Sequence, residues 1–297
     1  MIDVVNVSKT YGEVQAVADA SFHAPAGAVT AFVGRNGAGK STVLRMIAGL
    51  TRPDRGHVLV DGAPFERSEH PGRTLGTHLD ATALPPRLTA ASFLAWVCDT
   101  QGASRSRVVP ALEAVGLREA GARRIGGFSL GMRQRLGIAQ ACILEPQVMV
   151  FDEPVNGLDP DGIHWFRSFI AEQARNGKTV LLSSHNMAEL AMSADRVVVI
   201  DRGRILADQT LEELLRTRTG ETVYIESPDV HAVIGLFTQR GWTASPHDQG
   251  AIVTGATTLE VGRAAFADGV GLTHLSRTTA SLEETFFTLV QDGEGRR

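Results

Sequence analysis

The hydrophobic pattern along the N-terminal part of the chain predicts a series of short strands. Runs rich in valine, isoleucine and leucine recur, and several are apolar at every position, as in strands buried on both faces of a parallel sheet. These runs span residues 4–7, 29–33, 58–60, 148–151, 180–183 and 197–200. Because segments with helical features separate most of them, the pattern favours an α/β core in which helices cover the sheet.

The predicted helices lie between these strands, and several are closed by Gly or Pro. They cover residues 41–50, 92–99, 108–115, 132–144, 162–176 and 186–191. The part from about residue 80 to residue 131 contains helices and no convincing strand. We therefore expect a helical subdomain at about 80–131, inserted into the α/β core.

A second pattern begins after a polar stretch that ends in Gly-Glu at residue 221. Strands are predicted at 222–226, 242–245, 251–254 and 272–276, and helices at 230–240 and 259–268. This βαββαβ order is typical of ferredoxin-like domains. We expect a first domain over 1–218, a small C-terminal α+β domain over 221–290 with a closing helix at 281–290, and a flexible tail at 291–297.

The composition limits the possible functions. The 297-residue chain is 43% hydrophobic and carries a formal net charge of −4, which argues against a nucleic-acid partner and a polybasic membrane anchor. Two cysteines, Cys98 and Cys142, are too few for a disulfide framework, so we expect each of them to be a small core residue. The N-terminus lacks a secretory pattern, and no apolar run reaches about 18 residues. We therefore expect that the chain does not itself cross a membrane.

The strongest local motif is GRNGAGKST, which fits G-x-x-x-x-G-K-[ST] between a predicted strand and a predicted helix. Its glycines allow backbone N–H groups to point inward, and the helix presents its positive end to a phosphate. Lys40 would neutralise phosphate oxygens and Ser41 would bind Mg²⁺; the alternative is a plain glycine turn. The predicted nucleotide-binding residues here are Gly34, Arg35, Asn36, Gly37, Ala38, Gly39, Lys40, Ser41 and Thr42.

Two further strands end in polar residues. The run VMVFDEP places Asp152 and Glu153 at the carboxyl edge of the sheet, where ligands of open α/β folds bind. Asp152 would hold the Mg²⁺ shell, and Glu153 would take a proton from the attacking water. The run VLLSSHN places His185 at the same edge, where it could contact the γ-phosphate. Each residue could instead be an ordinary loop residue, but their combination favours ATP hydrolysis.

Together with NGLDP at 156–160 and FSLGMRQR at 128–135, these motifs resemble the ATP-binding subunit of ABC transporters over roughly residues 2–215. The resemblance implies a P-loop NTPase core of the ABC ATPase type. It also implies that Tyr11 stacks on adenine, although an ordinary strand-end tyrosine remains the alternative. Asp159 would lie across a head-to-tail dimer interface, and Ser129 and Gly131 would reach the γ-phosphate bound by the opposite subunit.

Two positions depart from the family pattern. The family usually has Leu-Ser-Gly-Gly-Gln where this chain has Phe-Ser-Leu-Gly-Met, which retains Ser129 and Gly131. The family often has glutamine where Asp80 stands; Asp80 could still contact Mg²⁺ or its water, or it could be a simple loop aspartate. Because the lysine, the two acids and the histidine are all present, we interpret the signature as a functioning variant.

The resemblance further implies the biological function. ATP and Mg²⁺ would close two copies as a homodimer, and closure would drive a separate integral membrane permease, with the chain peripheral at the cytoplasmic face of the membrane. The small appendage and the ending SLEETFFTLV are similar to bacterial exporters of the drug and peptide-antibiotic resistance kind. Two alternatives are a soluble ABC-type ATPase acting on ribosomes or nucleic acid, and a nucleotide-binding regulator that does not hydrolyse ATP.

Overall fold

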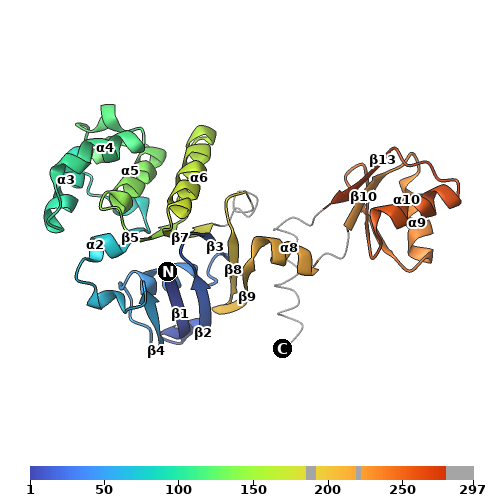
Figure 1. The fold of residues 1–297 in the computed structure, drawn as a ribbon, viewed down its shortest axis with the longest axis horizontal. Helices are drawn as coiled ribbons and strands as arrows, with labels where there is room; N and C mark the ends of the chain where they lie inside the picture. The colour runs from blue at the N-terminus through green and yellow to red at the C-terminus, as the bar shows by residue number, and fades with distance from the viewer. Residues whose placement is uncertain (185–191, 219–221, 279–297) are drawn as a thin grey trace. The chain divides into compact units, whose positions relative to one another are not determined.

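The computed structural model describes residues 1–184, 192–218 and 222–278, and divides the chain into two compact units (Figure 1). The first unit is Met1–Thr210 and the second begins at Leu211. The boundary thus falls before helix α8 (Leu211–Arg218), whereas the sequence predicted it after residue 218. The helix expected at 186–191, the closing helix expected at 281–290 and the expected tail lie outside the described residues.

A six-stranded sheet forms the centre of the first unit, in the order β5-β6-β7-β3-β8-β9. All neighbours are parallel except β8 and β9. Its central strands have no exposed side because helices or other strands cover both faces, which explains the continuous apolar runs. The strands are β3 (Val29–Val33), β5 (Leu75–His78), β6 (Val148–Asp152), β7 (Thr179–Ser184), β8 (Arg196–Asp201) and β9 (Arg204–Thr210).

A separate antiparallel sheet of three strands has the order β2-β1-β4. Its strands are β1 (Ile2–Tyr11), β2 (Val14–Ala24) and β4 (Arg55–Val60). Helix α1 (Lys40–Ile47) contacts all three and also β6, so its apolar side closes the core between the two sheets. The strands β2, β5 and β9 were not predicted from the sequence.

The inserted helical part contains α3 (Ala90–Thr100), α4 (Val108–Ala114) and α5 (Leu130–Cys142), which contact one another (Figure 1). Helix α5 begins two residues earlier than predicted because the Ser129 side chain caps it, accepting a hydrogen bond from the Met132 N–H. Helix α6 (Pro160–Arg175) packs on β7 and β3. The shorter helices are α2 (Pro71–Thr74), η1 (Phe65–Arg67), η2 (Ala81–Ala83), η3 (Arg105–Arg107), η4 (Arg118–Ala120) and η5 (Ile125–Gly127).

The second unit contains an antiparallel sheet in the order β11-β12-β10-β13. Its strands are β10 (Thr222–Glu226), β11 (Thr243–His247), β12 (Gly250–Thr254) and β13 (His274–Thr278). Helices α9 (Val230–Gln239) and α10 (Thr258–Ala267) complete a βαββαβ order, which is the arrangement expected from the sequence. The unit has its own apolar core, in which Phe237 and Val261 are fully buried.

Because each unit has its own core, a core mutation in the second should leave the first folded. We expect Phe237→Ala to destabilise the second unit by about 3–5 kcal/mol, the usual cost of truncating a buried aromatic side chain. Calorimetry of the full-length chain should show one transition shifted to lower temperature, with ATP binding unchanged. Loss of ATP binding, or a shift of the whole unfolding profile as one transition, would show that the two units fold together.

Candidate nucleotide-binding and catalytic site

The register of the parallel strands brings the predicted site residues to one edge of the sheet. Val33, the last residue of β3, pairs with Ser184, and Asp152 of β6 pairs with Ser183 of β7. The phosphate loop follows Val33 directly, and Glu153 follows Asp152. Because all three strands run in the same direction, their carboxyl ends form a single edge, and the loop and the two acids converge there.

The phosphate loop has the backbone geometry that its glycines allow. Gly37 and Gly39 have φ values of 79° and 104°, in the left-handed region that favours glycine. A Cβ on Gly39 would also lie 2.5 Å from the Ala16 carbonyl oxygen. Other residues would therefore strain the turn that leads into α1.

Lys40 lies at the start of α1 with its side chain folded back over the loop. Its Nζ donates hydrogen bonds to the carbonyl oxygens of Gly34 at 2.6 Å and Arg35 at 3.3 Å. Burial lowers the pKa of the ammonium, while the negative charges of Glu153 and Asp152 act in the opposite direction. The cation is thus enclosed by the loop and placed beside both acids.

A pocket of about 290 Å³ opens between the loop and the two acids. Six of the nine predicted residues of the phosphate loop line it, while Gly34, Arg35 and Ala38 do not. The lining residues are Ala16, Asn36, Gly37, Gly39, Lys40, Ser41, Thr42, Asp152 and Glu153. Ala16 was not predicted, because a small apolar residue in a strand carries no chemical signal.

Oxygen donors for a divalent cation gather at one side of this pocket. Ser41 Oγ donates a hydrogen bond to Asp152 Oδ2 at 2.8 Å, and Ser183 Oγ donates to Asp152 Oδ1. A hydroxyl and a carboxylate beside a phosphate pocket fit Mg²⁺, which binds few protein oxygens and keeps several waters. Ser183 was missed from the sequence, although it belongs to the polar end of a predicted strand.

Glu153 has a backbone conformation that is uncommon for residues other than glycine. Its φ is 50°, in the left-handed region. Its N–H donates to the carbonyl oxygen of Ser183 at 3.2 Å and to Ser183 Oγ at 3.1 Å, and its carbonyl oxygen accepts from Gln134 Nε2 at 3.2 Å. Hydrogen bonds to both its N–H and its carbonyl group therefore hold the Glu153 backbone in this strained conformation.

Two predicted site residues, Asp80 and Tyr11, do not line this pocket. The Asp80 carboxylate accepts two hydrogen bonds from Thr82 at 2.7 Å, which lower its pKa, and Asp80 does not line the phosphate pocket. Tyr11 is 47% exposed, with Lys9 Nζ 5.6 Å from its ring centroid, and it also lies outside the pocket lining. His185 lies outside the described residues.

The residues that were predicted to act across a dimer interface lie together on the surface of the first unit. A Cβ on Gly131 would come within 2.6 Å of the Gly157 carbonyl oxygen, so the absence of a side chain lets α5 approach the loop that precedes α6. Asp159 caps α6 by accepting from the Gly162 N–H at 2.9 Å, and it also contacts Arg135 Nη2 at 3.4 Å. Ser129 and Asp159 thus begin two neighbouring helices.

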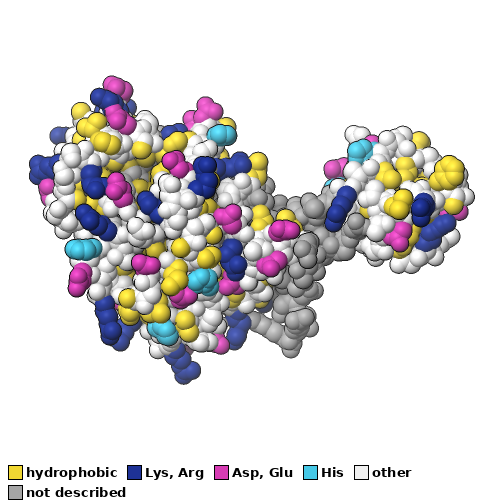
Figure 2. Space-filling view, in the orientation of Figure 1, with side chains coloured by type: hydrophobic (Ala, Val, Ile, Leu, Met, Phe, Trp, Pro, Cys, Tyr) yellow, Lys and Arg dark blue, Asp and Glu magenta, His cyan; other side chains and the backbone are white. Residues whose placement is uncertain are grey.

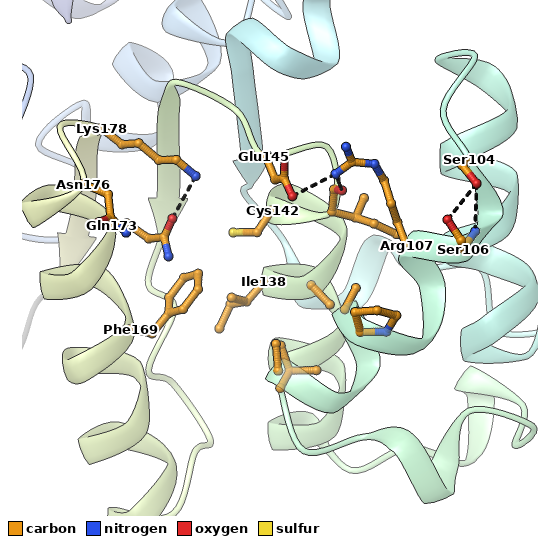
Figure 3. A pocket seen from close by; sticks show the side chains of 16 residues that line it. Ser104, Ser106, Arg107, Ile138, Cys142, Glu145, Phe169, Gln173, Asn176 and Lys178 are labelled. Carbon is orange, nitrogen blue, oxygen red and sulfur yellow. Dashed lines mark hydrogen bonds and ion pairs between the residues drawn. The ribbon is translucent and has the colours of Figure 1, made fainter.

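A larger pocket lies apart from this chemistry, between α4, α5 and α6 (Figure 3). It measures about 720 Å³, and Ile138, Cys142 and Phe169 line its apolar part. Arg107 and Glu145 form an ion pair of 3.0 Å at its edge. Burial raises the pKa of the Cys142 thiol to about 12, so the thiol stays protonated at neutral pH and is not a nucleophile.

Comparisons with known sequences find ATP-binding proteins of ABC transporters. The family described as ABC transporter matches residues 17–156, and a domain of unknown function matches residues 221–283. The bacitracin transport ATP-binding protein BcrA of Enterococcus faecalis is 31% identical, covering 99% of this chain and 97% of that protein. The lantibiotic transport ATP-binding protein SrtF of Streptococcus pyogenes is 34% identical, covering 73% of this chain and 97% of that protein. The Nod factor export ATP-binding protein I of Burkholderia orbicola is 34% identical, covering 78% of each.

Solved structures show the same fold. The structure of an ATP-binding subunit of an ABC transporter has a TM-score of 0.68 and 30% identity, covering 73% of this chain and 92% of that chain. A dimeric bacterial ABC transporter cassette has a TM-score of 0.64 and 24% identity, covering 71% of this chain and 99% of that chain. The chain therefore belongs to the ATP-binding subunits of ABC transporters, and it is an ATPase.

Proposed function

We propose that ATP binds with Mg²⁺ in the pocket between the phosphate loop and the two acids, and that Glu153 is the catalytic base. The observation that carries this proposal is the convergence of Lys40, Ser41, Asp152 and Glu153 on one pocket at the carboxyl edge of the sheet. Loop N–H groups and the N-terminus of α1 bind the β-phosphate and γ-phosphate. Lys40 exchanges its carbonyl partners for phosphate oxygens.

In this mechanism each of the remaining residues has a role that fits its chemistry. Ser41 and Asp152 hold Mg²⁺, which supplies positive charge beside the phosphate oxygens when it is bound. The Glu153 carboxylate accepts a proton from the attacking water, and His185 contacts the γ-phosphate. Tyr11 stacks on adenine, and its exposed ring is accessible for that role.

Catalysis requires two copies in this proposal. Ser129 and Gly131 of one copy complete the site of the other, and Asp159 lies in the interface between them. The surface placement of Ser129 and Asp159 at the starts of neighbouring helices supports this assignment. Asp80 is proposed to contact Mg²⁺ or its water after rearranging, because the two hydrogen bonds that it accepts from Thr82 belong to a short turn.

We further propose that the pair of ATPases drives export through a separate permease at the cytoplasmic face of the membrane. The similar proteins are named for transport of bacitracin, transport of a lantibiotic and export of Nod factor. No helix among the described residues has the length and apolar character needed to span a bilayer. On the face drawn in Figure 2, basic and acidic side chains are interspersed, which does not favour a nucleic-acid partner.

The dimer is tested with the Glu153→Gln variant, in which ATP is bound but hydrolysed slowly. We expect its mass by light scattering to rise from the 31.7 kDa of one chain to about twice that value when ATP and Mg²⁺ are added. ATP-free protein is the control, and Ser129→Arg should abolish the increase. A variant that binds ATP and stays monomeric would contradict the proposed homodimer.

A further inference from the structure

Gln134 lies in α5, five residues after Ser129, and its side chain is buried. Both ends of its amide are hydrogen-bonded. Nε2 donates to the carbonyl oxygen of Glu153 at 3.2 Å, and Oε1 lies 2.6 Å from His78 Nε2. A buried glutamine with specific partners at both ends is held in one orientation, because turning the amide would place like groups against each other.

His78 is the last residue of β5, and its ring is buried against α5. A Cβ on Gly137 would lie 2.1 Å from His78 Cε1, so the ring occupies the space that this glycine leaves open. Since Oε1 of Gln134 is an acceptor, His78 Nε2 carries the proton and donates. The hydrogen bonds therefore run from His78 to Gln134 and from Gln134 to the Glu153 carbonyl.

The last residue in this series of hydrogen bonds is Glu153, the proposed base. Its left-handed φ of 50° is unfavourable for a glutamate, so neighbouring groups must hold it. Ser183 of β7 binds the N–H side and Gln134 of α5 binds the carbonyl side. Without Gln134, the carbonyl side loses its bond to α5, and the carboxylate can move away from the phosphate pocket.

We propose that Gln134 is a positioning residue that holds Glu153 in its catalytic orientation, with His78 acting through Gln134. This inference rests on the proposed role of Glu153 as the base. It also links two sites: α5 carries Ser129 at its N-terminus, proposed to contact ATP of the opposite subunit, and holds the base of its own subunit through Gln134. A shift of α5 therefore moves both groups together.

The test compares Gln134→Leu with Gln173→Leu in the full-length chain. Each change replaces a glutamine with a side chain of similar shape that lacks the amide. Gln173, however, lies on α6 and bonds Lys178 beside the distant pocket of Figure 3. We expect Gln134→Leu to lower kcat roughly 10–100-fold, the usual cost of losing a residue that orients a catalytic group, with KM for ATP within about twofold. Gln173→Leu should keep the wild-type kcat.

His78→Phe is the second variant, because it keeps a ring beside Gly137 and removes only the N–H donor. We expect it to lower kcat by about 3–10-fold, less than Gln134→Leu, since Gln134 can still bind the Glu153 carbonyl. Normal ATP binding and an unchanged melting temperature would show that this variant is folded, even if Gln134→Leu proves unstable. An unchanged kcat in His78→Phe would remove His78 from the proposal.

The outcome for Gln134 is read separately from the outcome for Glu153. Wild-type kcat in a folded Gln134→Leu chain would overturn the inference and leave Glu153 as the base. An equal rise in KM and fall in kcat/KM, with kcat unchanged, would also overturn it, because the residue would then act on ATP binding. Normal hydrolysis by Glu153→Gln, measured in parallel, would instead overturn the proposed function.

Discussion

Replacing Glu153 with glutamine is expected to lower ATP hydrolysis by roughly 10²–10⁴-fold, the range for loss of a catalytic base. The amide has nearly the same shape as the carboxylate, so the strained peptide and its bonds to Ser183 and Gln134 can remain. The amide does not accept the proton of the attacking water at neutral pH. ATP affinity should be preserved, since Lys40 and the loop that are proposed to bind phosphate are unchanged.

Single-turnover phosphate release under saturating ATP measures this loss directly, and a fluorescent ATP analogue measures affinity. Glu145→Gln is a matched control, because Glu145 is an exposed carboxylate that pairs with Arg107 at the edge of the distant pocket. It should hydrolyse ATP at the wild-type rate. If Glu153→Gln also does so, another group is the base.

Replacing Lys40 with methionine is expected to lower kcat/KM for ATP by roughly 10²–10³-fold, the cost of losing one preorganised positive donor at a reacting phosphate. Methionine retains most of the length and apolar surface of the side chain but places no charge beside the γ-phosphate. It also leaves Asp152 and Glu153 without the nearby positive charge that balances them. Bound ATP would add further negative charge to the same pocket.

Lys40→Arg should not restore activity, because the planar guanidinium is larger than an ammonium and the side chain is only 7% exposed. Lys178→Met is the matched control, since Lys178 precedes the first residue of β7, at the opposite end of that strand from Ser183, and donates to Gln173 Oε1. Titration with a fluorescent ATP analogue and steady-state turnover separate binding from hydrolysis. Near-normal kcat/KM in Lys40→Met would show that the loop N–H groups alone carry the phosphate charge.

Local patterns predicted the central strands because those strands are buried on both faces and are apolar throughout. They did not predict β2, β5 or β9. Strand β5 is the short segment LGTH, in which a glycine and two polar residues interrupt the apolar pattern. It is a strand because it pairs with β6 in parallel register, and β9 likewise pairs with the edge of β8. Such pairing depends on residues far away in the chain, so a local window does not contain it.

The same distinction applies to the site. The phosphate loop is contiguous, so its glycines, Lys40 and Ser41 could be assigned from spacing, and the structure places Gly37, Gly39, Lys40 and Ser41 around one pocket. Ser183, Gln134 and His78 come from separate segments and have no motif of their own. Asp80 could be assigned a role only by analogy, and its observed partner is Thr82 two residues away.

The sequence by itself determined the family, the α/β core and the βαββαβ order of the C-terminal unit, and it supplied the candidates for the reacting groups. Each of these depends on contiguous residues or on the order of motifs along the chain. Only the tertiary structure decided which residues hold those groups in place, because His78, Gln134 and Glu153 become neighbours through strand pairing and the packing of α5 on β5. The hydrogen bonds around the proposed base therefore come from packing between distant segments, whereas the base itself was predicted from one local motif.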